Sequence, residues 1–181
     1  DTRDPKELKK IWRGDAEGCL ARGAIGTARA LYNCALSRLP GKKGLWLDLA
    51  NIETRYGDVD SLNAVLKRAT EACPNAEMLW LMRAKQMWNQ GDVDEARGVL
   101  AIAFQHSPES EAIHLAAVKL ESDNGEIARA RKLLINARRL CNSPKVWMQS
   151  AQLERMNGNT TQALALCEDG LKDHPNFGKL W

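Results

Sequence analysis

Tryptophan recurs along this chain at an almost constant interval. The series runs through Trp12, Trp46, Trp80, His114, Trp147 and Trp181. Every step is 34 residues except the step of 33 between His114 and Trp147, and His114 is the one member that is not tryptophan. An interval of this size marks a repeated supersecondary unit, which can bury its apolar face only by stacking on its neighbours.

Three further residue tracks keep the same interval. A glycine lies 11 residues after each start, at Gly23, Gly57, Gly91, Gly125 and Gly158. A small residue lies 23 residues after each start, at Ala35, Ala69, Ala103, Ala137 and Gly170. A proline lies six residues before a start, at Pro40, Pro74, Pro108 and Pro175, with Cys141 in the remaining slot. We interpret the glycines as left-handed turns after a first helix, the small residues as points of close helix approach, and the prolines as stops to second helices.

The segments between these landmarks have the apolar spacing of amphipathic helices. Val93, Ala96, Val99, Leu100 and Ala103 recur at spacings of three and four, and no stretch alternates with period two. We expect helix pairs at 6–22 with 25–38, 42–56 with 58–72, 76–90 with 92–106, 110–124 with 126–140, and 144–157 with 159–173. A helix–turn–helix unit of this length is of the tetratricopeptide type. The predicted fold is all-α, a right-handed superhelical solenoid of helix-hairpin repeats.

No linker separates the repeats, so we predict a single repeat array over residues 1–181. Its five repeats span 6–40, 41–74, 75–108, 109–141 and 142–175, and a further repeat begins at 176–181. The ends fall at repeat edges and lack polar capping helices, which is typical of a fragment cut from a longer array. We expect the uncapped ends to expose apolar surface through which the fragment self-associates.

Composition and spacing argue against catalysis. The chain has 26 Lys and Arg against 23 Asp and Glu, and a net charge of +3 is too small to make nucleic acid the default partner. The three histidines are far apart, and His114 is interpreted as a partly buried structural residue. The five cysteines are scattered without a C-x-x-C pair, as expected of free thiols. We therefore predict no enzyme, and no catalytic residue, cofactor, metal site, membrane segment or small-molecule substrate.

A polar stripe is expected beside the tryptophan face of the first helices. Positions one, five, eight and nine residues after each start fall on the adjoining face, which lines the concave groove in tetratricopeptide proteins. The partner-binding residues predicted there are Arg13, Glu17, Asn51, Arg55, Lys85, Trp88, Asn89, Lys119, Gln152 and Arg155. The stripe is mostly basic, so an extended or helical segment with acidic groups would suit it. Trp88 is interpreted either as packing or as a binding residue, and the lysines either as solubilising or as binding residues.

A basic run lies on the predicted second helix of the fourth repeat. It consists of Arg129, Arg131, Lys132, Arg138 and Arg139. Two interpretations remain open for it: a solvated outer face with local ion pairs, or a contact with RNA phosphates or an acidic partner.

The landmarks resemble the half-a-tetratricopeptide (HAT) class of repeat. That class has a glutamate seven residues after the tryptophan and Ala-Arg in the second helix. Here the glutamates are Glu53, Glu121 and Glu154, and the Ala-Arg pairs are Ala28-Arg29, Ala96-Arg97 and Ala130-Arg131. The pattern is broken at Cys19, Met87, Asn63 and Leu164.

Longer stretches such as LWLMRAK and LAAVKLES resemble the later repeats of the pre-mRNA-processing factor six family. His114 stands where that family would have tryptophan. The resemblance implies a nuclear, non-enzymatic splicing scaffold that bridges components of the spliceosomal tri-snRNP. Its partners would be spliceosomal snRNP proteins, with RNA as a secondary contact.

Two other functions have a similar fold. The first is another HAT or tetratricopeptide adaptor for RNA-processing or chaperone complexes. Chaperone adaptors hold a C-terminal carboxylate with basic and amide side chains, whereas the corresponding positions here include Glu17, Asp48 and Met78. The second is a one-base-per-repeat RNA reader, against which the tryptophan and proline landmarks and the modest charge argue.

Overall fold

The computed structural model describes residues 5–180, and within that range it contains ten helices and no strand. The helices are α1 (Pro5–Ala21), α2 (Ile25–Arg38), α3 (Lys43–Tyr56), α4 (Val59–Ala72), α5 (Glu77–Asn89), α6 (Val93–His106), α7 (Glu111–Asp123), α8 (Ile127–Leu140), α9 (Pro144–Met156) and α10 (Thr160–Asp173). The predicted all-α fold is confirmed, and no helix end differs from its predicted place by more than one residue. Trp181, which lies in the predicted sixth repeat, is outside the described residues.

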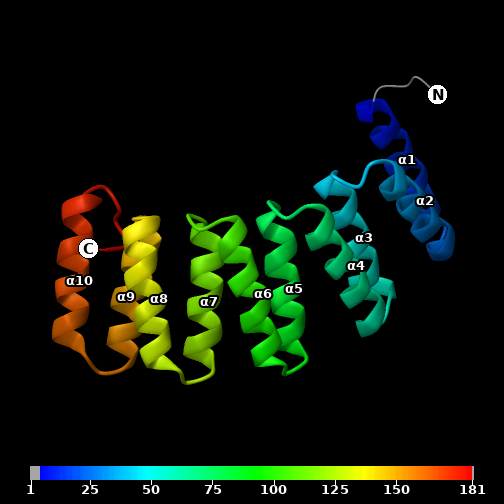
Figure 1. Cartoon of the computed structure of the whole chain (residues 1–181). Coiled ribbons are helices and arrows are strands. Elements are labelled where there is room, and N and C mark those ends of the chain that lie inside the picture. Colours follow the sequence, from blue (N-terminus) through cyan, green and yellow to red (C-terminus); the bar gives the residue numbers. More distant parts are fainter. Residues whose placement is uncertain (1–4, 181) are drawn as a thin grey trace. The chain divides into compact units, whose positions relative to one another are not determined.

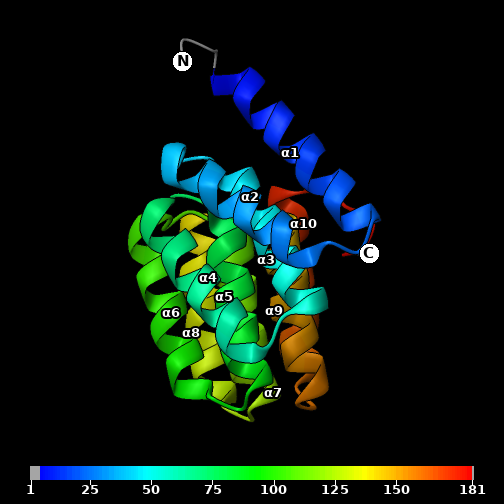
Figure 2. The same ribbon diagram turned by 90° about the vertical axis from the view of Figure 1, so that its right-hand side faces the viewer.

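Two compact units make up the chain, and their boundary lies between Gln86 and Met87, inside α5. In the first unit α1 packs against α2, α2 against α3, and α3 against α4 (Figure 2). In the second unit α6 packs against α7, and α7 to α10 lie side by side as two hairpins (Figure 1). Each unit therefore stacks helical hairpins in the way that repeat proteins do. The single continuous array over residues 1–181 stays a prediction.

The small-residue track marks the closest approach of helices, as predicted. Ala35, Ala69, Ala103 and Ala137 are all 0% exposed. At the fifth position of the track, a Cβ added to Gly170 would lie 2.9 Å from the Cβ of Trp147 and 3.1 Å from Cδ1 of Leu180. Even a methyl group would therefore push against the aromatic residue of the same repeat at this point.

Four of the five glycines in the glycine track have the predicted left-handed backbone. Their φ angles are 75° at Gly23, 84° at Gly91, 78° at Gly125 and 80° at Gly158. The prediction is wrong for Gly57, which is extended with φ −97° and ψ −175°. There the next residue, Asp58, begins α4 with a capping box to Ser61, so the turn needs no left-handed residue. Gly57 is instead required for space, because a Cβ would collide with Oε2 of Glu53 and lie 2.7 Å from the Ser61 hydroxyl.

The tryptophan and proline tracks meet in one hydrogen bond that closes the turn between repeats. The indole N–H of Trp46 donates to the carbonyl of Pro40 at 2.7 Å, and Trp80 donates to Pro74 at 2.7 Å. These two tryptophans are 3% and 5% exposed. A buried aromatic ring with one donor therefore fixes both the packing and the backbone of the turn.

The two irregular repeats preserve this hydrogen bond with different atoms. Nε2 of His114, which is 3% exposed, lies 2.9 Å from the carbonyl of Pro108, and this nitrogen must carry the proton because a carbonyl only accepts. After the fourth repeat, which is one residue shorter than the others, Trp147 donates at 2.8 Å to the side-chain oxygen of Asn142, whose φ is +39°. His114 therefore has a structural role, and at 3% exposed it is more deeply buried than the partial burial that the sequence predicted.

The imidazole of His114 is smaller than the indole found at this position in other repeats, and the side chain packed against it is correspondingly larger. The ring of Phe104 in α6 lies 4.6 Å from the His114 ring, centroid to centroid. The corresponding residue of α4, which precedes Trp80, is the smaller Thr70. Phe104 therefore occupies space that an indole at position 114 would need.

This size exchange predicts the outcome of a double substitution. His114→Trp alone should overpack the site and lower the free energy of unfolding by about 1–3 kcal/mol. Adding Phe104→Thr should recover most of that loss, although Phe104→Thr alone leaves a cavity and destabilises the chain. Urea unfolding of the four proteins at constant pH gives the coupling between the two sites. Additive effects of the two changes would contradict the packing account.

Candidate partner-binding surface

An arginine–glutamate pair connects successive repeats, and we term it the inter-repeat clamp. Its arginine lies on a second helix, its glutamate on the first helix of the next repeat, and the two side chains make two parallel hydrogen bonds. The three clamps are Arg29 with Glu53 at 2.8 and 2.8 Å, Arg97 with Glu121 at 2.8 and 2.8 Å, and Arg131 with Glu154 at 2.6 and 2.8 Å. These are the residues of the HAT pattern. Because bidentate pairing fixes orientation as well as distance, the clamps position the first helices that carry the predicted surface.

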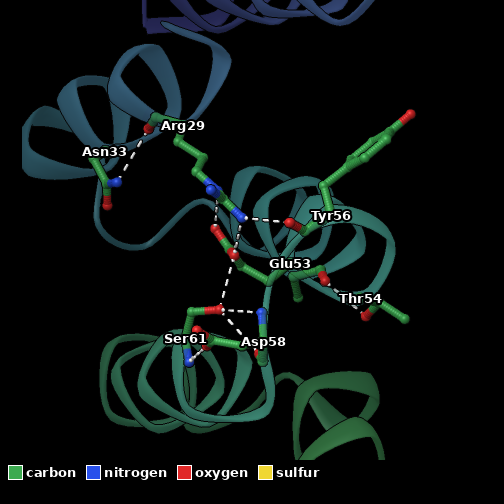
Figure 3. Close-up of polar contacts among 8 residues, drawn as sticks. Arg29, Asn33, Glu53, Thr54, Tyr56, Asp58 and Ser61 are labelled. Carbon is green, nitrogen blue, oxygen red and sulfur yellow. Dashed lines mark hydrogen bonds and ion pairs between the residues drawn. The ribbon is translucent and has the colours of Figure 1, made fainter. Parts of the chain in front are cut away.

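The clamp in the first unit is embedded in further hydrogen bonds (Figure 3). Glu53 is 5% exposed, and its Oε2 also accepts a hydrogen bond at 3.0 Å from the hydroxyl of Ser61 at the start of α4. Arg29 donates a third hydrogen bond, at 3.1 Å, to the backbone carbonyl of Tyr56. The carboxylate is thus connected to α2, α3 and α4 together, which satisfies a charge that would otherwise be costly to bury.

The clamp between α8 and α9 changes the ionisation of its glutamate. The hydrogen bond from Arg131 lowers the pKa of Glu154 below its usual value, and a second hydrogen bond comes from the amide of Asn159 at 2.8 Å. Glu154 raises the pKa of Arg131 in turn through the same hydrogen bond. The hydrogen bonds therefore favour the charged forms of both Glu154 and Arg131 in the folded state.

Where the chain departs from the HAT pattern, either the arginine or the glutamate of the inter-repeat clamp is replaced. Asn63 takes the arginine position of the second repeat, and Met87 takes the glutamate position of the third. Leu164 takes the arginine position of the last repeat, and Cys19 takes the glutamate position of the first. The pattern thus lacks two arginines and two glutamates. Each glutamate that remains has an arginine in the preceding repeat.

The predicted stripe residues of the first unit are exposed but partly neutralised. Arg13, Glu17, Asn51, Arg55 and Lys85 are all exposed. Arg13, however, makes an ion pair at 2.7 Å with Asp48 of α3 and another at 3.4 Å with Glu17. This ion pair does not follow from the repeat pattern, because Asp48 lies two residues after Trp46, outside the positions assigned to the stripe.

Asp48 belongs to a partly buried polar cluster with Tyr32. Burial raises the pKa of Asp48 despite the nearby Arg13 guanidinium, and Oδ2 of Asp48 is buried without a hydrogen-bond partner among residues 5–180. Burial, followed by the negative charge of Asp48, raises the pKa of Tyr32 to about 12. This end of the stripe is therefore a structural cluster with little free positive charge.

In the second unit the structure brings two of the predicted residues together. Lys119 and Gln152 line opposite sides of a groove of about 330 Å³ between α7 and α9, with Met156 at its edge. Met156 is 72% exposed. Gln152 and Arg155 also line a second groove, between α9 and α10.

The two remaining stripe residues lie near the start of the second unit, at the end of α5. Asn89 is exposed, whereas Trp88 is half-buried. Partial burial is compatible with packing and also with a ring that is accessible to a partner, so both interpretations of Trp88 stay open.

Most of the predicted basic run has a structural role. Arg131 belongs to a clamp, Arg138 lies over the Trp147 ring at 5.0 Å, and Arg129 lies 3.9 Å from Glu126. Burial lowers the pKa of Arg138. Lys132 and Arg139 are exposed and have no ion-pair partner within the described part of the chain. The structure thus supports the interpretation of local contacts for three of the five residues.

A family model and several known proteins match the chain. The model of the PRP39 C-terminal HAT repeat matches residues 41–156, well over half of the 181 residues. The chain belongs to this HAT-repeat family. Human Pre-mRNA-processing factor 6 is 47% identical to it over 47 residues, a stretch that covers 26% of the chain and 5% of that protein. The chain thus matches only a small part of this relative.

The solved structures that resemble the chain are tetratricopeptide-repeat (TPR) proteins. TTC0263 of Thermus thermophilus has a TM-score of 0.59 at 20% identity, covering 98% of this chain and 95% of its own. The MamA protein has a TM-score of 0.64 at 12% identity, covering 96% of both chains. A TPR protein from Parabacteroides merdae has a TM-score of 0.64 at 15% identity, covering 96% of this chain and 70% of its own. At these identities the likeness establishes the fold alone, a solenoid of helical hairpins.

Neither a membrane helix nor a metal cluster is found in the described residues. None of the described helices is long and apolar enough to cross a membrane. Within residues 5–180, no group of three or more His, Cys, Asp and Glu side chains could hold a metal ion.

The lowered pKa of Glu154 predicts how the α8–α9 clamp responds to pH. A carboxylate with a folded-state pKa below its unfolded value stabilises the fold above the unfolded pKa, and this contribution is lost as the pH falls through the folded pKa. Glu154→Gln should therefore lower the free energy of unfolding at pH 7, and the gap to the unmodified chain should narrow below the usual glutamate value of 4.5. Urea unfolding from pH 7 to acid measures the gap, with Glu168→Gln, at an exposed site of α10, as the control. A gap that is independent of pH would contradict the assignment.

Proposed function

We propose that this chain is a non-enzymatic protein-interaction scaffold in pre-mRNA splicing, acting in the nucleus and resembling the tri-snRNP-bridging factor. The identity of 47% with human Pre-mRNA-processing factor 6 over the matched stretch supports this assignment, together with the HAT-repeat family. Repeat scaffolds act by holding several partners at fixed spacing, so that weak contacts add together. Spliceosomal snRNP proteins would be the main partners, with RNA secondary.

The α7–α9 groove supports a specific mode of partner binding. Its lining combines the apolar side chains of Leu115, Val118 and Leu153 with two exposed charged residues of α7, Lys119 and Asp123. Lys119 is exposed and has no ion-pair partner within the described residues. An extended or helical segment that carries an acidic group beside apolar residues fits this arrangement. Lys85 of the first unit is also exposed and provides a second positive charge for the same class of partner.

Charge reversal at Lys119 tests this proposal. Lys119→Glu, alone and with Lys85→Glu, should weaken binding to tri-snRNP proteins about tenfold while the helical content stays unchanged. Lys132→Glu is the matched control, since Lys132 is also an exposed lysine and lies on α8 outside this groove. Quantitative pull-down of purified tri-snRNP components, with cross-linking mass spectrometry to locate the contact, measures the effect. Equal binding by the Lys119 variants and the unmodified chain would remove the groove from the proposal, and absence of binding by the unmodified chain would remove the splicing role.

A further inference from the structure

Two turns of the second unit contain the Asn–Gly sequences of this chain. Asn124 and Gly125 lie between α7 and α8, and Asn157 and Gly158 lie between α9 and α10. All four residues are exposed, and the two glycines have left-handed backbones with φ 78° and 80°. Asparagine before glycine is chemically reactive, because glycine has no side chain to hinder its nitrogen as it approaches the neighbouring amide.

The reaction at such a pair is an intramolecular deamidation. The backbone nitrogen of the glycine attacks Cγ of the asparagine and loses its proton, and the side-chain amide leaves as ammonia. Water then opens the resulting succinimide ring at one of its carbonyl carbons, which gives aspartate or isoaspartate. One water molecule is consumed, one ammonia molecule is released, and no oxidant or reductant takes part.

The closed turns hold both reacting groups in hydrogen bonds. Nδ2 of Asn124 donates to the carbonyl of Leu120 at 2.6 Å, and the N–H of Gly125 donates to the carbonyl of Ser122 at 3.1 Å. The corresponding hydrogen bonds of Asn157 and the glycine after it are 2.7 and 3.1 Å long. The attacking nitrogen and the leaving amide are therefore free to react only when the turn opens locally.

The glutamate of an inter-repeat clamp closes each of these turns through its backbone carbonyl. The carbonyl of Glu121 accepts a hydrogen bond from the N–H of Glu126 at 2.8 Å, and the carbonyl of Glu154 accepts one from Asn159 at 2.9 Å. A hydrogen bond that reaches back over the glycine in this way is the Schellman closure of a helix end. Since an arginine of the preceding repeat holds both glutamates, each clamp and its turn form one hydrogen-bonded unit.

The α9–α10 turn has one further hydrogen bond to its clamp. Nδ2 of Asn159 donates to Oε2 of Glu154 at 2.8 Å. The corresponding residue of the α7–α8 turn is Glu126, whose carboxylate has no N–H to donate to Glu121. The Asn159 hydrogen bond is thus an additional contact that must break before Asn157 reacts.

Two other hairpins show what the turn accepts at the asparagine position. Gln90 precedes Gly91 and Arg22 precedes Gly23, and both glycines have left-handed backbones. The fold therefore does not require asparagine there. Glutamine is also far less reactive, because its longer side chain would have to close a larger ring, so Gln90 is an internal comparison for the two asparagines.

We propose that Asn124 and Asn157 are sites of spontaneous deamidation by water, and that the hydrogen bond from Asn159 to Glu154 protects Asn157. The product places a new carboxylate at the C-terminal end of a first helix, where the helix dipole disfavours negative charge. Isoaspartate also adds a methylene group to the main chain directly before the glycine. Each conversion therefore weakens the turn in which it occurs. This inference is independent of the splicing role.

Peptide mapping by mass spectrometry during incubation of the purified chain at neutral pH measures the reaction. Conversion should occur at Asn124 and Asn157 and be absent at Gln90. Unfolding in urea should accelerate conversion at both asparagines at least about tenfold, because it removes the hydrogen bonds that close the turns. Asn124→Gln and Asn157→Gln should each abolish conversion at the substituted turn only.

Exchange of the residue after each glycine tests the protecting hydrogen bond. Asn159→Ala should accelerate conversion at Asn157 about tenfold and leave Asn124 unchanged, because one hydrogen bond to a charged group no longer opposes opening of that turn. Glu126→Asn introduces the corresponding donor beside Glu121 and should slow conversion at Asn124 by a similar factor. Glu126→Ala is the matched control, since it removes the same side chain without adding a donor, and it should leave Asn124 unchanged.

Circular dichroism verifies that each variant is folded, and Glu126→Asn keeps the test decisive if Asn159→Ala unfolds the chain, because Glu126 is an exposed residue. A folded chain without conversion at either asparagine after many half-lives of the unfolded reaction would overturn the proposal. Equal rates in the folded and unfolded chain would also overturn it. Equal acceleration at Asn124 and Asn157 by Asn159→Ala would overturn the protecting role of the hydrogen bond, since the whole unit would then have been destabilised.

Discussion

A carboxylate that is almost removed from water must have a permanent partner, and three glutamates impose this constraint here. Glu53, Glu121 and Glu154 are 5%, 6% and 3% exposed, and each accepts two hydrogen bonds from an arginine of the preceding repeat. Loss of either partner would leave the other charge unpaired and at least partly buried. The pair therefore fixes how a first helix packs against the helix before it. Since the predicted binding residues lie on first helices, the clamps also determine where that surface is presented. The HAT pattern is thus a description of one ion pair and of the helix packing that surrounds it.

The residues of the tryptophan track stabilise the turns between repeats. They do so through a side-chain hydrogen bond as well as through packing of the ring. Trp46 and Trp80 donate to the carbonyl of a proline, and His114 makes the same contact with Nε2. After the shorter fourth repeat, Trp147 donates to the side-chain oxygen of Asn142 instead. The fold therefore accommodates the smaller ring of His114 because its larger neighbour Phe104 fills the remaining space. It accommodates the shortening by one residue before Trp147 because the side-chain oxygen of Asn142 replaces the backbone carbonyl as acceptor. In both cases the donor remains satisfied and the interior remains packed.

The charges that remain for partners are fewer than the composition suggests. Arg13 is paired with Asp48, Arg131 is committed to a clamp, and Arg138 lies against an indole. The exposed positive charges left over include Lys119 beside an apolar groove, and Lys132 and Arg139 on α8. A small set of basic side chains beside apolar grooves favours short protein segments as partners over the long phosphate backbone of a nucleic acid, whose binding needs many such charges.

The sequence by itself determined where the helices begin and end. The repeat interval and the glycine, small-residue and proline tracks all follow from local backbone conformation and from the spacing between helices. The resemblance to the HAT pattern also marked the clamp residues, and helical periodicity placed the stripe residues on one face, where all except Trp88 are exposed. The sequence failed where the deciding contact is made by residues far apart in the chain or by a close approach of side chains. Only the tertiary structure showed that Gly57 is required for space beside Glu53 and not for a left-handed turn, that Arg13 is held by Asp48 35 residues away, and that Lys119 and Gln152 face one groove. Periodicity places a side chain on a face of its own helix, whereas its partner depends on which helix packs against that face and how closely the two backbones approach.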